Sequence, residues 1–165
     1  MRFKIFEDGF NLYQAGQVKL INMTDRTAIF EVDGVDVRAE LRSSQLRFHC
    51  GCTFHKKRML QDKLCKRIIA ALAFMRYQKK KVRLPIIVMA DKIKGKLGVW
   101  LERKKEKSVM FNVNDIPVII EKSQSGTKFI CHCELHLPVE IQDKLCVEML
   151  ATIFWLYDKR GKVKK

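Results

Sequence analysis

The sequence predicts an α+β fold built from two tandem repeats, each an antiparallel β-sheet followed by a loop and one C-terminal α-helix. Two observations lead to this prediction. The chain aligns with itself without a gap when residue 50 is moved onto residue 131, a shift of 81 positions. Within each copy, apolar residues first alternate with polar ones, as in a strand, and then recur about every 3.6 residues, as in a helix. We therefore expect one supersecondary unit used twice, at 1–81 and 82–165.

The repeat is strongest around the cysteines. The string QDKLC occurs at 61–65 and again at 142–146, and the similarity reaches the start of each copy, where 2–6 aligns with 83–87. All six cysteines of the chain occupy equivalent positions. The pattern C-x-C-x2-H-x9-C therefore occurs once in each copy, as Cys50, Cys52, His55 and Cys65 in the first and Cys131, Cys133, His136 and Cys146 in the second.

Each copy is expected to begin with strands. Asp33-Gly34 lies between the apolar runs 28–32 and 35–41, which is typical of a tight hairpin, and Asn114-Asp115 takes its place in the second copy. Alternation continues toward the first two cysteines, so one strand face carries apolar residues and then both sulfurs. The residues of this face in the first copy are Leu46, Phe48, Cys50 and Cys52.

A helix is expected to close each copy, with a cysteine at its start. Pro138 suits the first turn of the second helix, and the charge run at 78–85, which ends at a proline, suits an exposed connector between the copies. The apolar positions at helical spacing are Leu60, Leu64, Ile68, Leu72 and Met75 in the first copy and Ile141, Leu145, Met149, Ile153 and Leu156 in the second.

The cysteine pattern predicts a tetrahedral zinc site in each copy, and hence two zinc ions per chain. The N-terminus lacks the apolar stretch of a secretory signal, so we expect a cytoplasmic protein, or a nucleoid or nuclear one if it accompanies nucleic acid. In a reducing compartment, cysteines at a repeated spacing favour metal over disulfides. The expected zinc ligands are Cys50, Cys52, His55, Cys65, Cys131, Cys133, His136 and Cys146.

Two alternatives stay open at this site. A single free cysteine ordinarily packs as a small buried hydrophobe, although four candidate ligands at identical offsets in two copies favour a metal. The histidines carry less weight than the cysteines. His49 and His132 are not equivalent under the repeat, and either is able to substitute for the predicted histidine if the loop turns the other way.

A C-x-C pair on a strand, a loop, and then a cysteine at the start of an apolar helix resembles the SWIM zinc finger. The likeness covers residues 30–76 and again 111–157. That family ends its pattern in C-x-H, but Arg67 and Glu148 stand at the histidine positions here. The resemblance therefore implies variant sites, in which His55 and His136 replace the missing ligand or only three ligands remain. It also implies nucleic-acid and protein contacts.

The formal net charge of +15 favours an anionic partner, and we expect DNA or RNA bound mainly through its backbone. The basic residues gather in the first copy, whereas the second has acidic residues in the corresponding region. The tail at 159–165 is a second basic element. The residues expected to contact nucleic acid are Lys56, Lys57, Arg58, Lys63, Lys66, Arg67, Arg76, Lys79, Lys80 and Lys81.

Other functional classes are less favoured by the sequence. No Gly-rich phosphate loop, paired-carboxylate motif or H-E-x-x-H pattern occurs, so we expect neither an enzyme nor a small-molecule substrate. The longest apolar runs, 68–75 and 84–90, are shorter than the roughly 20 residues that span a bilayer, so no membrane partner is expected. Two alternatives remain: an adaptor that docks a helicase, transposase or nuclease, and a redox sensor that releases zinc on oxidation.

Overall fold

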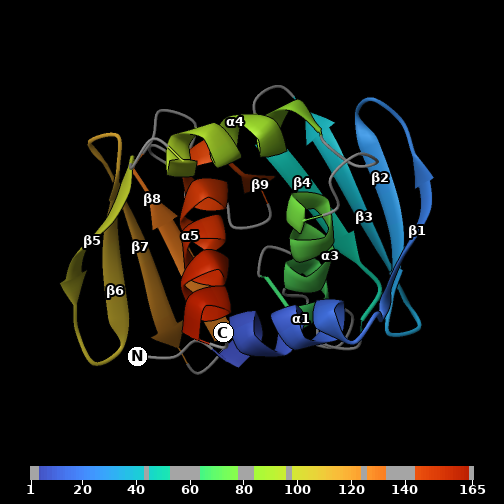
Figure 1. The fold of residues 1–165 in the computed structure, drawn as a ribbon, viewed down its shortest axis with the longest axis horizontal. Helices are drawn as coiled ribbons and strands as arrows, with labels where there is room; N and C mark the ends of the chain where they lie inside the picture. The colour runs from blue at the N-terminus through green and yellow to red at the C-terminus, as the bar shows by residue number, and fades with distance from the viewer. Residues whose placement is uncertain are drawn as a thin grey trace.

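A computed structural model describes residues 4–42, 45–52, 64–77, 84–95, 98–123, 126–132 and 144–163. Two antiparallel sheets lie on opposite sides of the molecule, and the helices lie between them (Figure 1). The first repeat contains α1 (Lys4–Gln14), β1 (Val18–Met23), β2 (Thr27–Val32), β3 (Val35–Arg42), β4 (Gln45–Cys50) and α3 (Lys66–Tyr77). The second contains α4 (Pro85–Gly95), β5 (Val99–Lys104), β6 (Ser108–Val113), β7 (Ile116–Ser123), β8 (Gly126–Cys131), β9 (Lys144–Leu145) and α5 (Val147–Val163).

The tandem α+β organisation predicted from the sequence is confirmed. Equivalent elements begin at residues separated by the predicted shift, as in α1 and α4, β3 and β7, and α3 and α5. Even an irregularity is repeated: the register of the first hairpin slips between Leu20 and Asn22, and that of the second between Leu101 and Arg103. The duplication is therefore present in the structure as well as in the sequence.

The predicted hairpins are also confirmed. Asp33 and Gly34 have φ values of 52° and 76°, and Asn114 and Asp115 have φ values of 48° and 68°. Two consecutive residues with positive φ form the turn whose twist matches that of the flanking strands, and Asn, Asp and Gly tolerate this conformation best. The alternation that follows turns one face of each sheet inward, and the side chains buried there include Phe30, Val37, Leu46, Phe48, Phe111, Val118, Ile120 and Phe129.

The prediction that each copy begins with strands is wrong, because α1 and α4 precede the strands. On α1, Phe6, Gly9 and Phe10 are buried along one face. A Cβ atom added to Gly9 would lie 2.6 Å from the Cβ of Ile69, so glycine allows α1 to cross α3 closely.

The closing helices begin later than predicted. α3 starts at Lys66 and α5 at Val147, so Leu64 and Cys65 precede α3, and Leu145 belongs to β9. Pro138 lies outside the described residues and ahead of α5, so it does not occupy the first turn of that helix. Pro85 takes this role in α4 instead, because its fixed φ and missing N–H suit a helix start.

The two repeats share one continuous hydrophobic core and are therefore not two separate domains. The Tyr157 hydroxyl of α5 donates a 2.6 Å hydrogen bond to the Ile69 carbonyl of α3. Phe6 of α1 meets Phe129 of β8 edge to face, with ring centroids 6.0 Å apart. Each of these contacts joins the two halves, so neither repeat completes its core alone.

The interface contains a pair of positions that has diverged between the repeats. The Arg76 guanidinium lies 3.0 Å from a carboxylate oxygen of Asp91 and 3.3 Å from one of Asp158. The repeat places Tyr157 at the position of Arg76, and Phe10 at that of Asp91. The Phe10 and Tyr157 rings lie 5.7 Å apart. The Arg76–Asp91 ion pair and the Phe10–Tyr157 ring contact thus occupy equivalent places in the interface.

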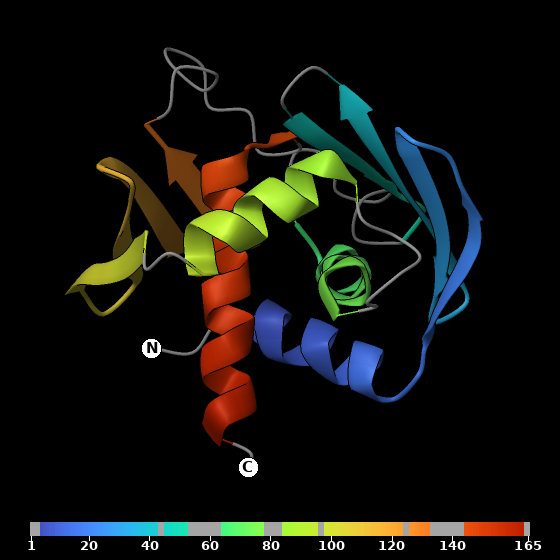
Figure 2. The ribbon, with the colours of Figure 1, turned by 45° about the horizontal axis from the view of Figure 1, so that its top comes forward.

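A strand of the second repeat joins the sheet of the first. Leu145 and Lys144 of β9 pair with Leu46 and Arg47 of β4, which gives the first sheet the order β1-β2-β3-β4-β9 (Figure 2). The second sheet has the order β5-β6-β7-β8. Within the described part of the chain, no helix combines the length and apolar character required to cross a membrane.

Candidate metal centres

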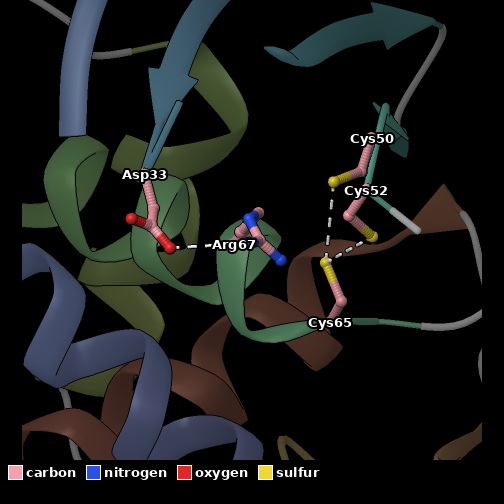
Figure 3. Close-up of polar contacts among 5 residues, drawn as sticks. All are labelled: Asp33, Cys50, Cys52, Cys65 and Arg67. Atoms are coloured by element: carbon pink, nitrogen blue, oxygen red, sulfur yellow. Dashed lines mark hydrogen bonds and ion pairs between the residues drawn. The ribbon is translucent and has the colours of Figure 1, made fainter. Parts of the chain in front are cut away.

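Three cysteine sulfurs meet at the end of β4. Cys50 closes the strand, Cys52 follows it, and Cys65 lies immediately before α3 (Figure 3). The Cys65 Sγ is 3.7 Å from the Cys50 Sγ and 4.0 Å from the Cys52 Sγ. Zinc binds thiolates at about 2.3 Å, so two sulfurs of a tetrahedral site are separated by about 3.8 Å. The observed separations fit a shared ion without rearrangement.

None of the five cysteines that the structure describes forms a disulfide. A disulfide requires sulfurs about 2.05 Å apart, which is far shorter than the separations seen here. Cys52 and Cys65 are buried, and Cys50 is partly exposed. The cluster is therefore a group of thiols that converge in a largely closed site.

Without a cation, this convergence is electrostatically unfavourable for thiolates. The hydrogen bond that Cys50 shares with Cys65, its burial, and the charge of the neighbouring sulfur together raise the pKa of the Cys50 thiol. A divalent cation among the sulfurs reverses this effect, because a coordinated thiol is deprotonated. The donor set therefore fits a thiophilic metal.

Arg67 lies beside the first cluster but is directed toward a turn. Its guanidinium nitrogen is 3.5 Å from a carboxylate oxygen of Asp33, at the β2–β3 turn (Figure 3). This contact ties the first turn of α3 to the sheet. Because Arg67 carries a cation, it supplies no metal ligand at the position where the SWIM pattern has histidine.

The second cluster differs from the first. The Sγ atoms of Cys131, at the end of β8, and Cys146, just before α5, are 3.6 Å apart, and both residues are buried. A carboxylate oxygen of Glu148 lies within 4.8 Å of both sulfurs. Carboxylate is an accepted zinc ligand, and Glu148 is equivalent to Arg67. The two repeats therefore present different donor sets.

The second cluster is also tied to the first repeat. Cys146 directly follows β9, which pairs with β4 of the first sheet. Cys131 ends β8 of the second sheet. A metal held by these two cysteines would therefore connect both sheets as well as α5.

No protein-family model, curated protein or solved structure matches the chain. The resemblance to the SWIM zinc finger thus rests on the cysteine spacing and the helices that follow it.

The structure brings together five of the eight predicted metal ligands, in two groups that are each able to hold a metal ion. The remaining three, His55, Cys133 and His136, lie outside the described residues. His49 and His132 are exposed, and neither belongs to a cluster in the described part of the chain.

Most of the predicted nucleic-acid contacts also lie outside the described residues, namely Lys56, Lys57, Arg58, Lys63, Lys79, Lys80 and Lys81. Lys66 and Arg67 are partly exposed at the start of α3. The Arg76 side chain is only 15% exposed and faces Asp91 and Asp158. Because two carboxylates already contact its guanidinium, Arg76 does not present to nucleic acid the free cation that the sequence indicates.

Glu148 is the residue of these clusters that the predicted ligand set omits. Its signal in the sequence is its place two residues after Cys146, at the position of the family's last ligand. Spacing in the sequence does not distinguish a histidine ligand from a carboxylate ligand, because that depends on which side chain points at the sulfurs.

Proposed function

We propose that each cluster holds one structural zinc ion and that the folded chain binds nucleic acid, DNA or RNA, mainly through backbone contacts. The observation that carries the zinc assignment is the convergence of Cys50, Cys52 and Cys65 at separations suited to a tetrahedral ion. Sulfur-rich sets favour zinc over magnesium or calcium, which prefer oxygen ligands. His55 would complete the first site.

The second site would use Cys131, Cys146 and Cys133, with either His136 or Glu148 as the fourth ligand. Both choices give four protein ligands and a closed coordination shell. Closed shells are typical of structural zinc, whereas catalytic zinc keeps a position for water. We therefore propose a binding role and not an enzymatic one.

Burial favours a structural role over a redox sensor. Four of the five described cysteines are buried, and Cys146 is fully so. Redox-sensing thiols are accessible to oxidant. Zinc here would instead add binding free energy to folding, because each site links a sheet to the helix that follows it.

Nucleic acid is proposed as the partner on the basis of charge. The chain has 33 lysines and arginines against 18 acidic residues. Such an excess favours binding to phosphate backbones, with an affinity that falls as the salt concentration rises. The SWIM resemblance points in the same direction. The membership of the chain in that family remains part of the proposal.

The expected result is a steep dependence of binding on salt. Titrating fluorescein-labelled DNA or RNA with the zinc-loaded protein should give an affinity that falls at least about tenfold between 50 and 200 mM salt, since roughly three or more phosphate contacts would each release a counterion on binding. Fluorescence anisotropy measures the change. Absence of binding to DNA and RNA at the lower salt would contradict the proposal and favour an adaptor that docks another protein.

A further inference from the structure

The outer faces of the two sheets differ, although the sheets are equivalent. Cross-strand partners share a face of a sheet, so the register identifies the outward rows. In the second sheet, Arg103, Met110, Ile119 and Ile130 form one row. In the next row, Trp100 pairs with Asn112, and Asn112 pairs with Pro117 on its other side. The outer face of the second sheet is therefore apolar at Trp100, Met110, Pro117, Ile119 and Ile130, and the row beyond them, with Ser108 and Glu121, is polar.

The equivalent rows of the first sheet are more polar, although Ile29 is apolar. The repeat replaces Trp100 by Lys19, Met110 by Ile29, Pro117 by Asp36, Ile119 by Arg38 and Ile130 by His49. Trp100 is 45% exposed and lies beside the apolar row of Met110, Ile119 and Ile130. Compared with the first repeat, the second has apolar residues at these central positions, whereas its hairpin has Glu102 and Lys104 in place of the exposed Ile21 and Met23.

Basic residues border this apolar face. The β5–β6 hairpin carries Arg103, Lys104, Lys105 and Lys107 against Glu102 and Glu106, and all six are exposed. Lys122 lies next to the hairpin, because its backbone N–H donates a 2.8 Å hydrogen bond to the Lys107 carbonyl. The equivalent hairpin of the first repeat has one basic and one acidic residue, Arg26 and Asp25, and Leu41 stands at the position of Lys122.

We infer that the outer face of β5–β8 is a docking surface for single-stranded nucleic acid, an inference that rests on the proposed function. An exposed aromatic ring offers a stacking platform for an unpaired base, and the bordering cations neutralise adjacent phosphates. The partly buried side chains of Met110 and Ile119 provide an apolar floor beside the ring. A duplex keeps its bases stacked on one another, so it leaves the exposed ring unused.

This surface is distinct from the one predicted from the sequence. That prediction placed the contacts around the metal loop and closing helix of the first repeat. The face described here belongs to the second repeat and contains neither cysteine cluster. Substitutions on it therefore leave both metal sites and the shared core in place.

The test uses the full zinc-loaded chain and single strands of about 20 nucleotides, long enough to cover one binding face. The chain has two tryptophans. Trp155 packs against Phe111, with ring centroids 5.0 Å apart, beneath the sheet. In Trp155→Phe, Trp100 is the remaining reporter, and its fluorescence should be quenched saturably by oligothymidylate or oligouridylate. Anisotropy of labelled strands, measured with the wild-type chain, gives the affinity independently of this variant.

Two variants separate stacking from charge. Trp100→Ala should weaken single-strand binding about tenfold while the salt dependence is kept, because one stacked base is lost. The double variant Lys104→Gln with Lys105→Gln should reduce the magnitude of the salt slope by about 1.4, since two phosphate contacts are removed. Ile21→Ala, at an exposed position of the equivalent strand in the first repeat, is the matched control and should bind as the wild type does.

The outcomes distinguish this surface from the proposed function. A single-strand affinity and salt slope equal to those of the wild type, in both Trp100→Ala and the double lysine variant, would overturn the surface while leaving nucleic-acid binding intact. Absence of wild-type binding to any nucleic acid would overturn both. Tighter binding to a duplex, or equal binding to polyglutamate and single strands, would also overturn the surface, the latter by indicating an acidic protein partner.

Discussion

Cys65→Ser is expected to lower the zinc content from two ions per chain to one, because this sulfur lies 3.7 Å from that of Cys50 and 4.0 Å from that of Cys52. It should also lower the free energy of unfolding by at least about 3 kcal/mol. Structural zinc contributes about 10 to 16 kcal/mol of apparent binding free energy in zinc-finger peptides, and this becomes folding free energy. Native mass spectrometry and urea unfolding measure the two effects.

Two further variants serve as controls for this prediction. Cys146→Ser should likewise leave one ion, now in the first repeat, so the pair of variants tests whether the sites load separately. His49→Ala removes an exposed histidine close in sequence to Cys50 and should retain both ions. Unchanged zinc content and stability in Cys65→Ser would show that its sulfur is a packing group.

Arg76→Met is expected to lower the free energy of unfolding by about 3 kcal/mol, without loss of either metal. Both carboxylates lose the guanidinium from a partly buried site, and among the described residues only Asp158 keeps another partner, the Tyr77 hydroxyl. Methionine keeps the apolar contact with the Tyr77 and Phe154 rings, which now lie beneath the guanidinium. The loss therefore reports mainly on charge.

Arg38→Met is the matched control, because Arg38 is exposed on the outer face of the first sheet. A surface substitution of this kind ordinarily changes stability by less than about 0.5 kcal/mol. Urea unfolding followed by tryptophan fluorescence compares the two variants. Equal stability of Arg76→Met and Arg38→Met would mean that the ion pairs between α3, α4 and α5 do not hold the repeats together.

The repeat and the strands were predictable because both leave local signals. Asp33-Gly34 and Asn114-Asp115 mark the hairpins by residues that tolerate positive φ, and the alternation between them assigns each side chain to a face. Cys50 and Cys65 were brought together on the same grounds, since one ends a strand and the other precedes a helix. Such signals depend on neighbours in the chain.

The first helix of each repeat was missed because its pattern is short and serves a distant partner. Gly9 looks like a helix breaker in isolation, yet it lies in α1 because Ile69 packs against it. In the second repeat, 85–90 is an unbroken apolar run, in which no helical period stands out.

Pairing between the repeats was not predictable from the sequence. β9 contains only Lys144 and Leu145, and its place beside β4 depends on how the two halves pack. The same holds for Arg76: its charge indicates a nucleic-acid contact in the sequence, but in the structure Asp91 and Asp158 face it. Long-range contacts of this kind have no periodic signature.

The most direct test of the account is the metal content of the purified full chain, measured by native mass spectrometry under reducing conditions. The convergence of sulfurs in both repeats predicts two zinc ions per folded chain, and their removal by a chelator should lower the melting temperature. A reduced, folded chain that binds no zinc and melts at the same temperature with and without chelator would contradict it.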